Sequence, residues 1–154
     1  QEELDALNPL DFGVHYIYNA RKCDWPSEEA QKLVFFFVVG NKGNVQQFQP
    51  IANSLFEYTQ KVAKYISAQT CTDLYVFDLK DLPNAFSHAT LQKQAEYVAA
   101  KTAHLVKLNG YTHINFATHS LGSYVARLAM QQKDFPIQNL ENIFALASTL
   151  RAAP

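Results

Sequence analysis

The nine residues Ile114–Gly122, with the sequence INFATHSLG, decide how this chain is expected to fold. The first part, Ile114–Thr118, is a short run rich in apolar and β-branched residues, which is typical of a buried strand. Beyond the turn, Val125, Leu128 and Ala129 recur at the spacing of one helix face. We therefore expect the strand to end and a helix to begin with almost no loop between them, and a serine lies at that turn.

Ser120 occupies the turn, and Gly122 follows two residues later. A strand–turn–helix of the form G-x-S-x-G, called a nucleophile elbow, holds a serine hydroxyl above a sheet edge, beside a helix N-terminus. We predict Ser120 as an attacking nucleophile, the amide of Leu121 as a donor to an oxyanion, and Gly122 as the small residue that lets helix and strand approach. Thr118 stands where this pattern has its first glycine, so the match is partial.

A second informative loop follows Leu33–Val39, an apolar run without alternation that is typical of a strand buried on both faces. The loop Gly40–Asn44 (GNKGN) is rich in residues that tolerate unusual backbone angles. We expect the amide of Asn41 to be the second oxyanion donor, with Gly40 and Gly43 letting the backbone approach a substrate carbonyl. The alternative is that these glycines only turn the chain. The phosphate-binding patterns G-x-G-x-x-G and G-K-[ST] are absent from the sequence.

Short β-rich runs alternate with amphipathic helical stretches along the chain. Predicted strands span residues 15–18, 33–39, 74–79, 114–118 and 142–147, and predicted helices run from about Pro50, from a cap at Thr90 to Asn109 and Gly110, and after Ser120. The expected inward faces are Ile51, Leu55, Tyr58, Val62, Tyr65 and Ile66 for the first helix, and Leu91, Ala95, Val98, Thr102, Leu105 and Val106 for the second. The pattern predicts a mostly parallel sheet with helices on both faces, and together with the elbow at Ser120 it indicates the α/β-hydrolase type. Residues 1–154 are expected to form a single, partial domain, the N-terminal half of that fold.

Composition and charge narrow the class of protein. The 154 residues are 48% apolar and 18% charged with a net charge of −1, which indicates an ordered globular chain without a basic footprint for nucleic acid. The longest apolar run is far shorter than the roughly 20 residues of a membrane span. Because the chain begins with Gln1 rather than Met, we expect a mature form or a piece of a longer chain. Cys23 and Cys71 could form one bridge or remain separate thiols.

The histidines and Asp78 add no second site. The five histidines show neither metal-ligand spacing nor an H-E-x-x-H motif, so we expect neither a metal nor a cofactor. His119 precedes the predicted nucleophile, but consecutive residues on a tight turn point apart. We therefore interpret His119 as a packing or hydrogen-bonding residue rather than a base. Asp78, at the end of a predicted strand, is interpreted as a carboxylate that anchors a loop.

Several stretches, in series, resemble the PGAP1-like GPI inositol-deacylases, lipase-like members of the α/β-hydrolase fold. The loop Gly40–Gly43 is similar to that family's P-G-N-x-G-S. Phe77–Leu79 and Leu91–Tyr97 (LQKQAEY) resemble its V-D-F and L-x-x-Q-x-E-Y, while His119–Gly122 and Val125–Arg127 match its H-S-M-G and V-A-R. The ordered series is more specific than any single motif.

This resemblance implies a serine hydrolase at the endoplasmic reticulum membrane or in its lumen, where Ser120 attacks the fatty acyl ester on the inositol of a GPI anchor. The sequence departs from the family at Val39, where the family has proline, and at Ser148–Arg151, which replaces a T-P-H. In that family the catalytic aspartate and histidine follow the serine. Here Asp134 and Glu141 are the only acids after Ser120, and no histidine follows it. The base and its acid are therefore expected from residues outside this sequence.

The same departures leave open a second class of function. A catalytically inactive α/β-hydrolase-like domain could serve as an interaction or structural subunit. A half-sheet that ends at Ile143–Ala147 would leave a strand edge and an apolar surface uncovered. We expect another chain, or a C-terminal half of the fold, to cover that edge.

Overall fold

The computed structural model describes residues 10–17, 32–40, 45–66, 71–82, 84 and 86–146. Within these ranges the sheet consists of β1 (Gly13–Ile17), β2 (Lys32–Val38), β3 (Cys71–Asp78), β4 (Ile114–His119) and β5 (Leu140–Leu146). The connections are the 3-10 turn η1 (Val45–Phe48) with α2 (Gln49–Ile66), then α3 (His88–Asn109), and last α4 (Gly122–Met130) with the 3-10 turn η2 (Ile137–Asn139). The predicted order of strands and helices is confirmed.

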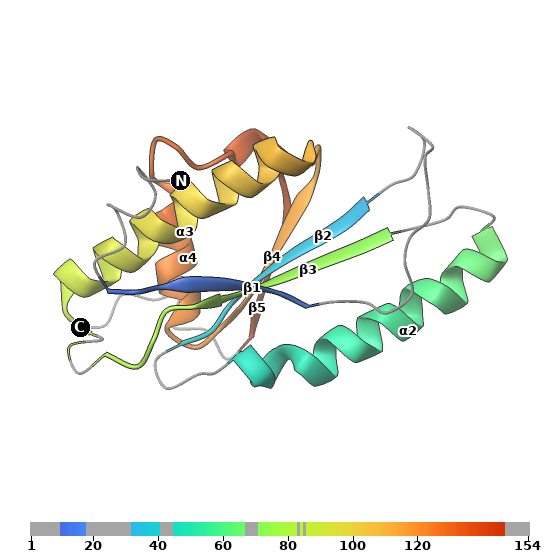
Figure 1. Cartoon of the computed structure of the whole chain (residues 1–154), viewed down its shortest axis with the longest axis horizontal. Coiled ribbons are helices and arrows are strands. Elements are labelled where there is room, and N and C mark those ends of the chain that lie inside the picture. Colours follow the sequence, from blue (N-terminus) through green and yellow to red (C-terminus); the bar gives the residue numbers. More distant parts are fainter. Residues whose placement is uncertain are drawn as a thin grey trace.

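The sheet has the strand order β1-β3-β2-β4-β5, and only β1 runs antiparallel to its neighbour. Figure 1 shows α2 alone on one side of the sheet and α3 and α4 on the other. The predicted mostly parallel sheet with helices on both faces is therefore confirmed. The chain steps from β2 to β3 on one side and then returns to β4 on the other side of β2. The carboxyl ends of β2 and β4 thus meet where the strand order reverses.

Strand β2 is the centre of the core, as its unbroken apolar run predicts. Val34, Phe36, Phe37 and Val38 are all at most 1% exposed. On the α3 and α4 face, Phe36 stacks on Phe116 with ring centroids 5.4 Å apart and contributes to an aromatic row across β3, β2 and β4. Burying a side chain of this size is worth about 1.5–3 kcal/mol, so the row is a large part of what holds the sheet to its helices.

The other face is only partly covered, and here one prediction is wrong. Among the described side chains of α2, Ala52 and Phe56 are buried, whereas Ile51 is 42% and Tyr58 is 64% exposed. Helical spacing places Ile51 and Tyr58 on one side of α2. That side faces a part of the sheet that no described residue covers. The side chains of the other four residues expected to face inward, Leu55, Val62, Tyr65 and Ile66, lie outside the described ones.

Helix α3 begins at His88, two residues before Thr90. Ser87 is the N-cap, because its hydroxyl oxygen accepts a hydrogen bond from the backbone N–H of Thr90 at 3.2 Å. The cap prediction at Thr90 was therefore wrong by three residues. Gly110 ends the helix in the left-handed conformation, as predicted. The expected inward residues of α3 are confirmed as buried, with Val106 partly so. No described helix is long and apolar enough to cross a membrane.

Three tyrosines fasten the amino-terminal end of β3. The Tyr111 hydroxyl donates to Asp73 Oδ2 at 2.6 Å, and the Tyr16 hydroxyl donates to Asp73 Oδ1 at 2.9 Å. The hydroxyls of Tyr75 and Tyr111 lie 2.7 Å apart. Burial raises the pKa of the Tyr111 hydroxyl well above its ordinary value, and the bonds to Asp73 and Tyr75 raise it further. Burial likewise raises the pKa of Tyr75.

The raised pKa of Tyr111 predicts an alkaline loss of stability. The unfolded state releases the tyrosine proton near pH 10 while the folded state retains it, so stability is full below that pH and falls as pH rises above it. We expect Tyr111→Phe to lower the free energy of unfolding by about 1.5–3 kcal/mol at pH 7, the range for a hydrogen bond to a charged group. The loss should shrink above pH 10. Urea unfolding at pH 7 and pH 11 measures both, and the exposed Tyr58→Phe is the control. An equal loss at both pH values would contradict this origin.

Candidate active site

Gly40 and Ser120 come together where the strand order reverses. Val38 of β2 pairs with Thr118 of β4, so these two strands end side by side. Gly40 and Ser120, which lie just beyond them, therefore emerge at the same edge of the sheet. A Cβ atom built on Gly40 would lie 3.1 Å from the Cβ of Ser120. In open α/β sheets, ligands bind at such a reversal, outside the carboxyl ends of the strands. The ends of the two segments that the sequence singled out, Gly40 and Ser120, therefore lie together at this edge.

Ser120 turns the chain sharply between β4 and α4. Its φ is +52°, in the left-handed region that residues with a Cβ rarely adopt. The Ser120 N–H donates to the carbonyl of Leu146 in β5 at 3.1 Å, and the Ser120 carbonyl accepts from the N–H of Ser123 at 3.1 Å. A conformation of this kind costs roughly 1–3 kcal/mol and persists only where its surroundings enforce it. Here β5 and the first turn of α4 hold it from both sides.

The close approach predicted for Gly122 is confirmed. A Cβ atom at this position would lie 2.3 Å from the carbonyl oxygen of Val38 and 2.8 Å from its carbonyl carbon. Only glycine therefore lets the first turn of α4 rest against the end of β2. The same contact brings Leu121 close to Gly40. A Cβ atom built on Gly40 would lie 3.1 Å from the backbone nitrogen of Leu121.

Thr118 departs from the pattern without disturbing the turn. It is fully buried, and its hydroxyl lies 2.8 Å from the hydroxyl of Ser123 in the first turn of α4. A buried hydroxyl needs a hydrogen-bond partner, and Ser123 supplies one three residues after the turn. The threonine therefore joins β4 to α4 through its side chain.

The predicted oxyanion donors are only partly described. The Leu121 residue precedes α4, and backbone N–H groups at the start of a helix have no partner within it. The Leu121 amide nitrogen lies next to Gly40, at the 3.1 Å given above for a Cβ atom built on Gly40. Asn41 and Gly43 lie outside the described residues, and so does Cys23, the possible partner of Cys71. His119 ends β4, partly buried, and pairs with Leu146 of β5.

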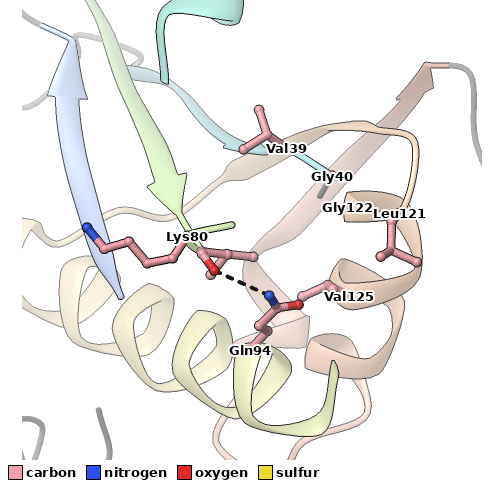
Figure 2. A pocket seen from close by; sticks show the side chains of 8 residues that line it. Val39, Gly40, Lys80, Gln94, Leu121, Gly122 and Val125 are labelled. Carbon is pink, nitrogen blue, oxygen red and sulfur yellow. Dashed lines mark hydrogen bonds between the residues drawn. The ribbon is translucent and has the colours of Figure 1, made fainter. Parts of the chain in front are cut away.

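A small cavity of about 10 Å³ lies directly beneath this turn. Figure 2 shows it between the end of β2, the end of β3, the start of α4 and one side chain from α3. Its walls are Val39, Gly40, Leu79, Lys80, Gln94, Leu121, Gly122 and Val125. Five of these residues were not predicted as part of the site, and Lys80 and Gln94 are the two with polar side chains. Gln94 had a signal in the sequence, because it is the polar member of the otherwise apolar set Leu91, Gln94, Ala95 and Val98.

Asp78 anchors the loop after β3, as predicted. Its Oδ1 accepts from the backbone N–H of Lys80 at 3.1 Å, and its Oδ2 accepts from Lys80 Nζ at 3.0 Å. Partial burial opposes ionisation of Asp78, but the bonds from Lys80 outweigh it and hold the pKa of the carboxyl below its ordinary value. His15 Nε2 lies 3.7 Å from Asp78 Oδ2. Lys80 itself has a φ of +59°, so the wall of the cavity contains a second strained residue.

The described residues contain no group of three or more histidines, cysteines or acids that could hold a metal ion.

Comparison with solved structures defines the class of protein. The Bacillus licheniformis lipase BlEst2 superposes with a TM-score of 0.56 at 15% identity, over 89% of this chain and 46% of that one. MGS-MChE2, an alpha/beta hydrolase enzyme from a Mar Chica lagoon sediment metagenome, gives a TM-score of 0.54 at 13% identity, over 90% of this chain and 49% of that one. The fold is that of part of an α/β-hydrolase.

The sequence comparison names the family. Residues 29–154 match the PGAP1-like alpha/beta domain, and the chain belongs to that family. It is 33% identical over 109 residues to a GPI inositol-deacylase of Cryptococcus neoformans var. neoformans serotype D, covering 61% of this chain and 14% of that protein. It is 26% identical over 160 residues to a GPI inositol-deacylase of Coccidioides immitis, covering 90% of this chain and 14% of that protein. The chain thus spans about one seventh of the length of these relatives.

The contact between α4 and β2 predicts a severe effect of Gly122→Ala. Because the added methyl would meet a backbone carbonyl 2.3 Å away, α4 must move, and we expect a loss of at least about 3 kcal/mol, the upper end for overpacking. Urea unfolding followed by circular dichroism measures it. The control is Gly13→Ala, whose Cβ would have its nearest neighbour at 3.9 Å. Equal unfolding midpoints for the two variants would show that the contact is not a tight one.

Proposed function

We propose that this chain carries the nucleophile of a serine esterase that hydrolyses a fatty acyl ester of a lipid, of the GPI inositol-deacylase type. The observation that carries the proposal is the left-handed turn at Ser120, enforced between β4 and α4 with the backbone of Gly40 against it. A strained φ at a serine on the edge of the sheet is expected of a residue held ready to react, because the strain itself does not stabilise the fold. Membership of the PGAP1-like family supports the lipid substrate.

In the proposed reaction, Ser120 Oγ attacks the acyl carbonyl carbon and gives its proton to a base. The carbonyl oxygen becomes an oxyanion, which accepts hydrogen bonds from the amide of Leu121 and, we propose, from that of Asn41. Collapse of this intermediate breaks the ester bond, and the alcohol leaves with the proton from the base. Water then hydrolyses the acyl-serine ester and releases the fatty acid. The base and its orienting acid would be supplied from outside these 154 residues, because no histidine follows Ser120.

The names of the relatives suggest the substrate of this reaction. Both relatives compared above are named GPI inositol-deacylases. We propose the inositol-linked acyl chain of a GPI lipid as the substrate and the endoplasmic reticulum as the compartment. The alternative function, an inactive hydrolase-like domain in an assembly, requires no reaction at Ser120, so one chemical test separates the two.

Fluorophosphonate labelling tests the proposed nucleophile. In the longest natural form of the polypeptide, we expect the probe to modify Ser120 and Ser120→Ala to abolish both labelling and ester hydrolysis. Loss of the nucleophile in a triad enzyme lowers the rate by about 10⁶-fold. The control is Thr112→Ala, which removes an exposed hydroxyl before β4 and should leave labelling unchanged. A wild-type protein that is folded and not labelled would establish the inactive alternative instead.

A second substitution at the same position separates function from stability. Ser120→Gly removes the side chain from a left-handed residue, so we expect it to raise the free energy of unfolding by about 1 kcal/mol while it abolishes labelling. Ser120→Ala retains the strained geometry and should leave stability nearly unchanged. If Ser120→Gly were no more stable than Ser120→Ala, the turn would not be strained.

An apolar groove of about 420 Å³ lies on the α2 side of the sheet. The sheet contributes Phe35, Phe37, Ala117, Phe144 and Leu146, and α2 contributes Ile51, Ser54 and Tyr58. Strand β5 forms the outer edge of the groove. Among the described strands it pairs with β4 alone, and Phe144 is half exposed. An unpaired edge strand next to an open apolar groove is a template for further contacts.

We propose that the remainder of an α/β-hydrolase domain covers this groove and the β5 edge. The argument is length: the lipase and the hydrolase compared above each contain about twice the chain that this fold matches. The same remainder would supply the base and acid that the proposed reaction needs. In this proposal, one and the same part of the domain covers the groove and completes the set of catalytic residues.

The uncovered groove predicts that the 154-residue chain by itself binds apolar dyes and associates. We expect 8-anilinonaphthalene-1-sulfonate fluorescence that falls in Phe144→Ser, with a matching fall in association by analytical ultracentrifugation. Phe86→Ser is the control, because Phe86 is 77% exposed and does not line the groove. A chain that stays monodisperse at high concentration and binds no dye would overturn the proposed cover.

A further inference from the structure

Gln94 is a polar side chain inside the apolar face of α3. It is 6% exposed, and its neighbours on the helix face, Leu91, Ala95 and Val98, are all buried. A buried amide is destabilising unless its hydrogen bonds are made. Its Nε2 donates to the carbonyl oxygen of Leu79 at 3.3 Å, at the end of β3. The residue therefore reaches across the core to the strand end that precedes the strained Lys80.

The same side chain forms a wall of the cavity under the Ser120 turn. Figure 2 shows the amide nitrogen of Gln94 turned toward the end of β3 and its amide oxygen turned toward Val125 of α4. Gly40, Leu121 and Gly122 line the opposite side of the cavity. Gln94 thus lies between the end of β3 and the backbone that the proposed function assigns to oxyanion binding.

We infer that Gln94 is a positioning residue for this oxyanion site. Its bond to Leu79 fixes the end of β3, where Asp78 holds Lys80 in its left-handed conformation. Leu79 and Lys80 in turn close the cavity against Gly40 and Leu121. Oxyanion stabilisation depends on donors held at fixed positions, and a displacement of about 1 Å can lower a rate about 100-fold. The inference rests on the proposed function, because it concerns the same reaction.

Three variants of the longest natural polypeptide test the inference. Gln94→Leu removes the hydrogen bond at similar volume, and Gln94→Glu removes the donor while its carboxyl is ionised. Gln92→Leu is the matched control, because Gln92 is on the same helix and its Nε2 bonds Glu96 at the surface. We expect Gln94→Leu to lower kcat for an ester substrate at least 10-fold with KM unchanged, and Gln92→Leu to leave both unchanged.

The pH dependence of Gln94→Glu separates positioning from general destabilisation. A protonated carboxyl can donate to the Leu79 carbonyl as the amide does, whereas a carboxylate cannot. The ratio of variant to wild-type kcat should therefore rise at least several-fold from pH 8 to pH 5.5. A ratio that is constant with pH would overturn the inference, as would Gln94 variants with wild-type kcat. This readout remains available if Gln94→Leu does not fold.

Hydrogen exchange tests the inference apart from the proposed reaction. We expect the amides of residues 120–124 to exchange at least 10-fold faster in Gln94→Leu than in Gln92→Leu, measured by mass spectrometry. If the wild-type protein is not labelled at Ser120, the proposed function is wrong. Faster amide exchange in Gln94→Leu would still establish in that case that Gln94 holds the turn. Unchanged exchange in Gln94→Leu would overturn the positioning role whether or not Ser120 reacts.

Discussion

The contact between Gly122 and the carbonyl of Val38 is the constraint on which the rest of the site depends. No side chain fits between the first turn of α4 and the end of β2, because a Cβ there would lie 2.3 Å from the carbonyl oxygen. Only Ser120 and Leu121 separate β4 from α4, and Leu121 already has helical backbone angles, so the change of direction falls on Ser120. Its left-handed φ follows from this lack of room.

That constraint also explains how two distant loops become one site. Since β2 and β4 are neighbours in register, seating α4 on β2 brings the start of the helix against Gly40. The turn is then secured by three further bonds: Ser120 to Leu146 in β5, Ser123 back to Ser120, and the paired hydroxyls of Thr118 and Ser123. A left-handed serine is stable here because backbone bonds from two elements hold it, which is how folds maintain strain at reactive positions.

The two faces of the sheet differ in a way that bears on function. On the α3 and α4 side, an aromatic row and a continuous buried cluster join the sheet to both helices, and Gln94 reaches the site from within that layer. On the α2 side, the buried cluster is smaller and ends at an open groove beside β5. The site thus rests on the fully packed layer, while the side next to β5 is the part that, in our proposal, a larger domain would complete.

The sequence by itself determined the order of strands and helices, the buried character of β2, and the turn at Ser120, because each depends on local periodicity or on a glycine with few alternatives. It also determined that no histidine follows Ser120. Only the tertiary structure decided that Ile51 and Tyr58 face an open groove, because helical spacing identifies an apolar side and not what lies opposite it. It likewise decided the places of Gln94 and Lys80, which come from α3 and the end of β3 and reach the site only when the sheet assembles. A polar residue on an apolar helix face signals a buried hydrogen bond, but its partner, the Leu79 carbonyl, is fixed by packing between elements distant in the chain.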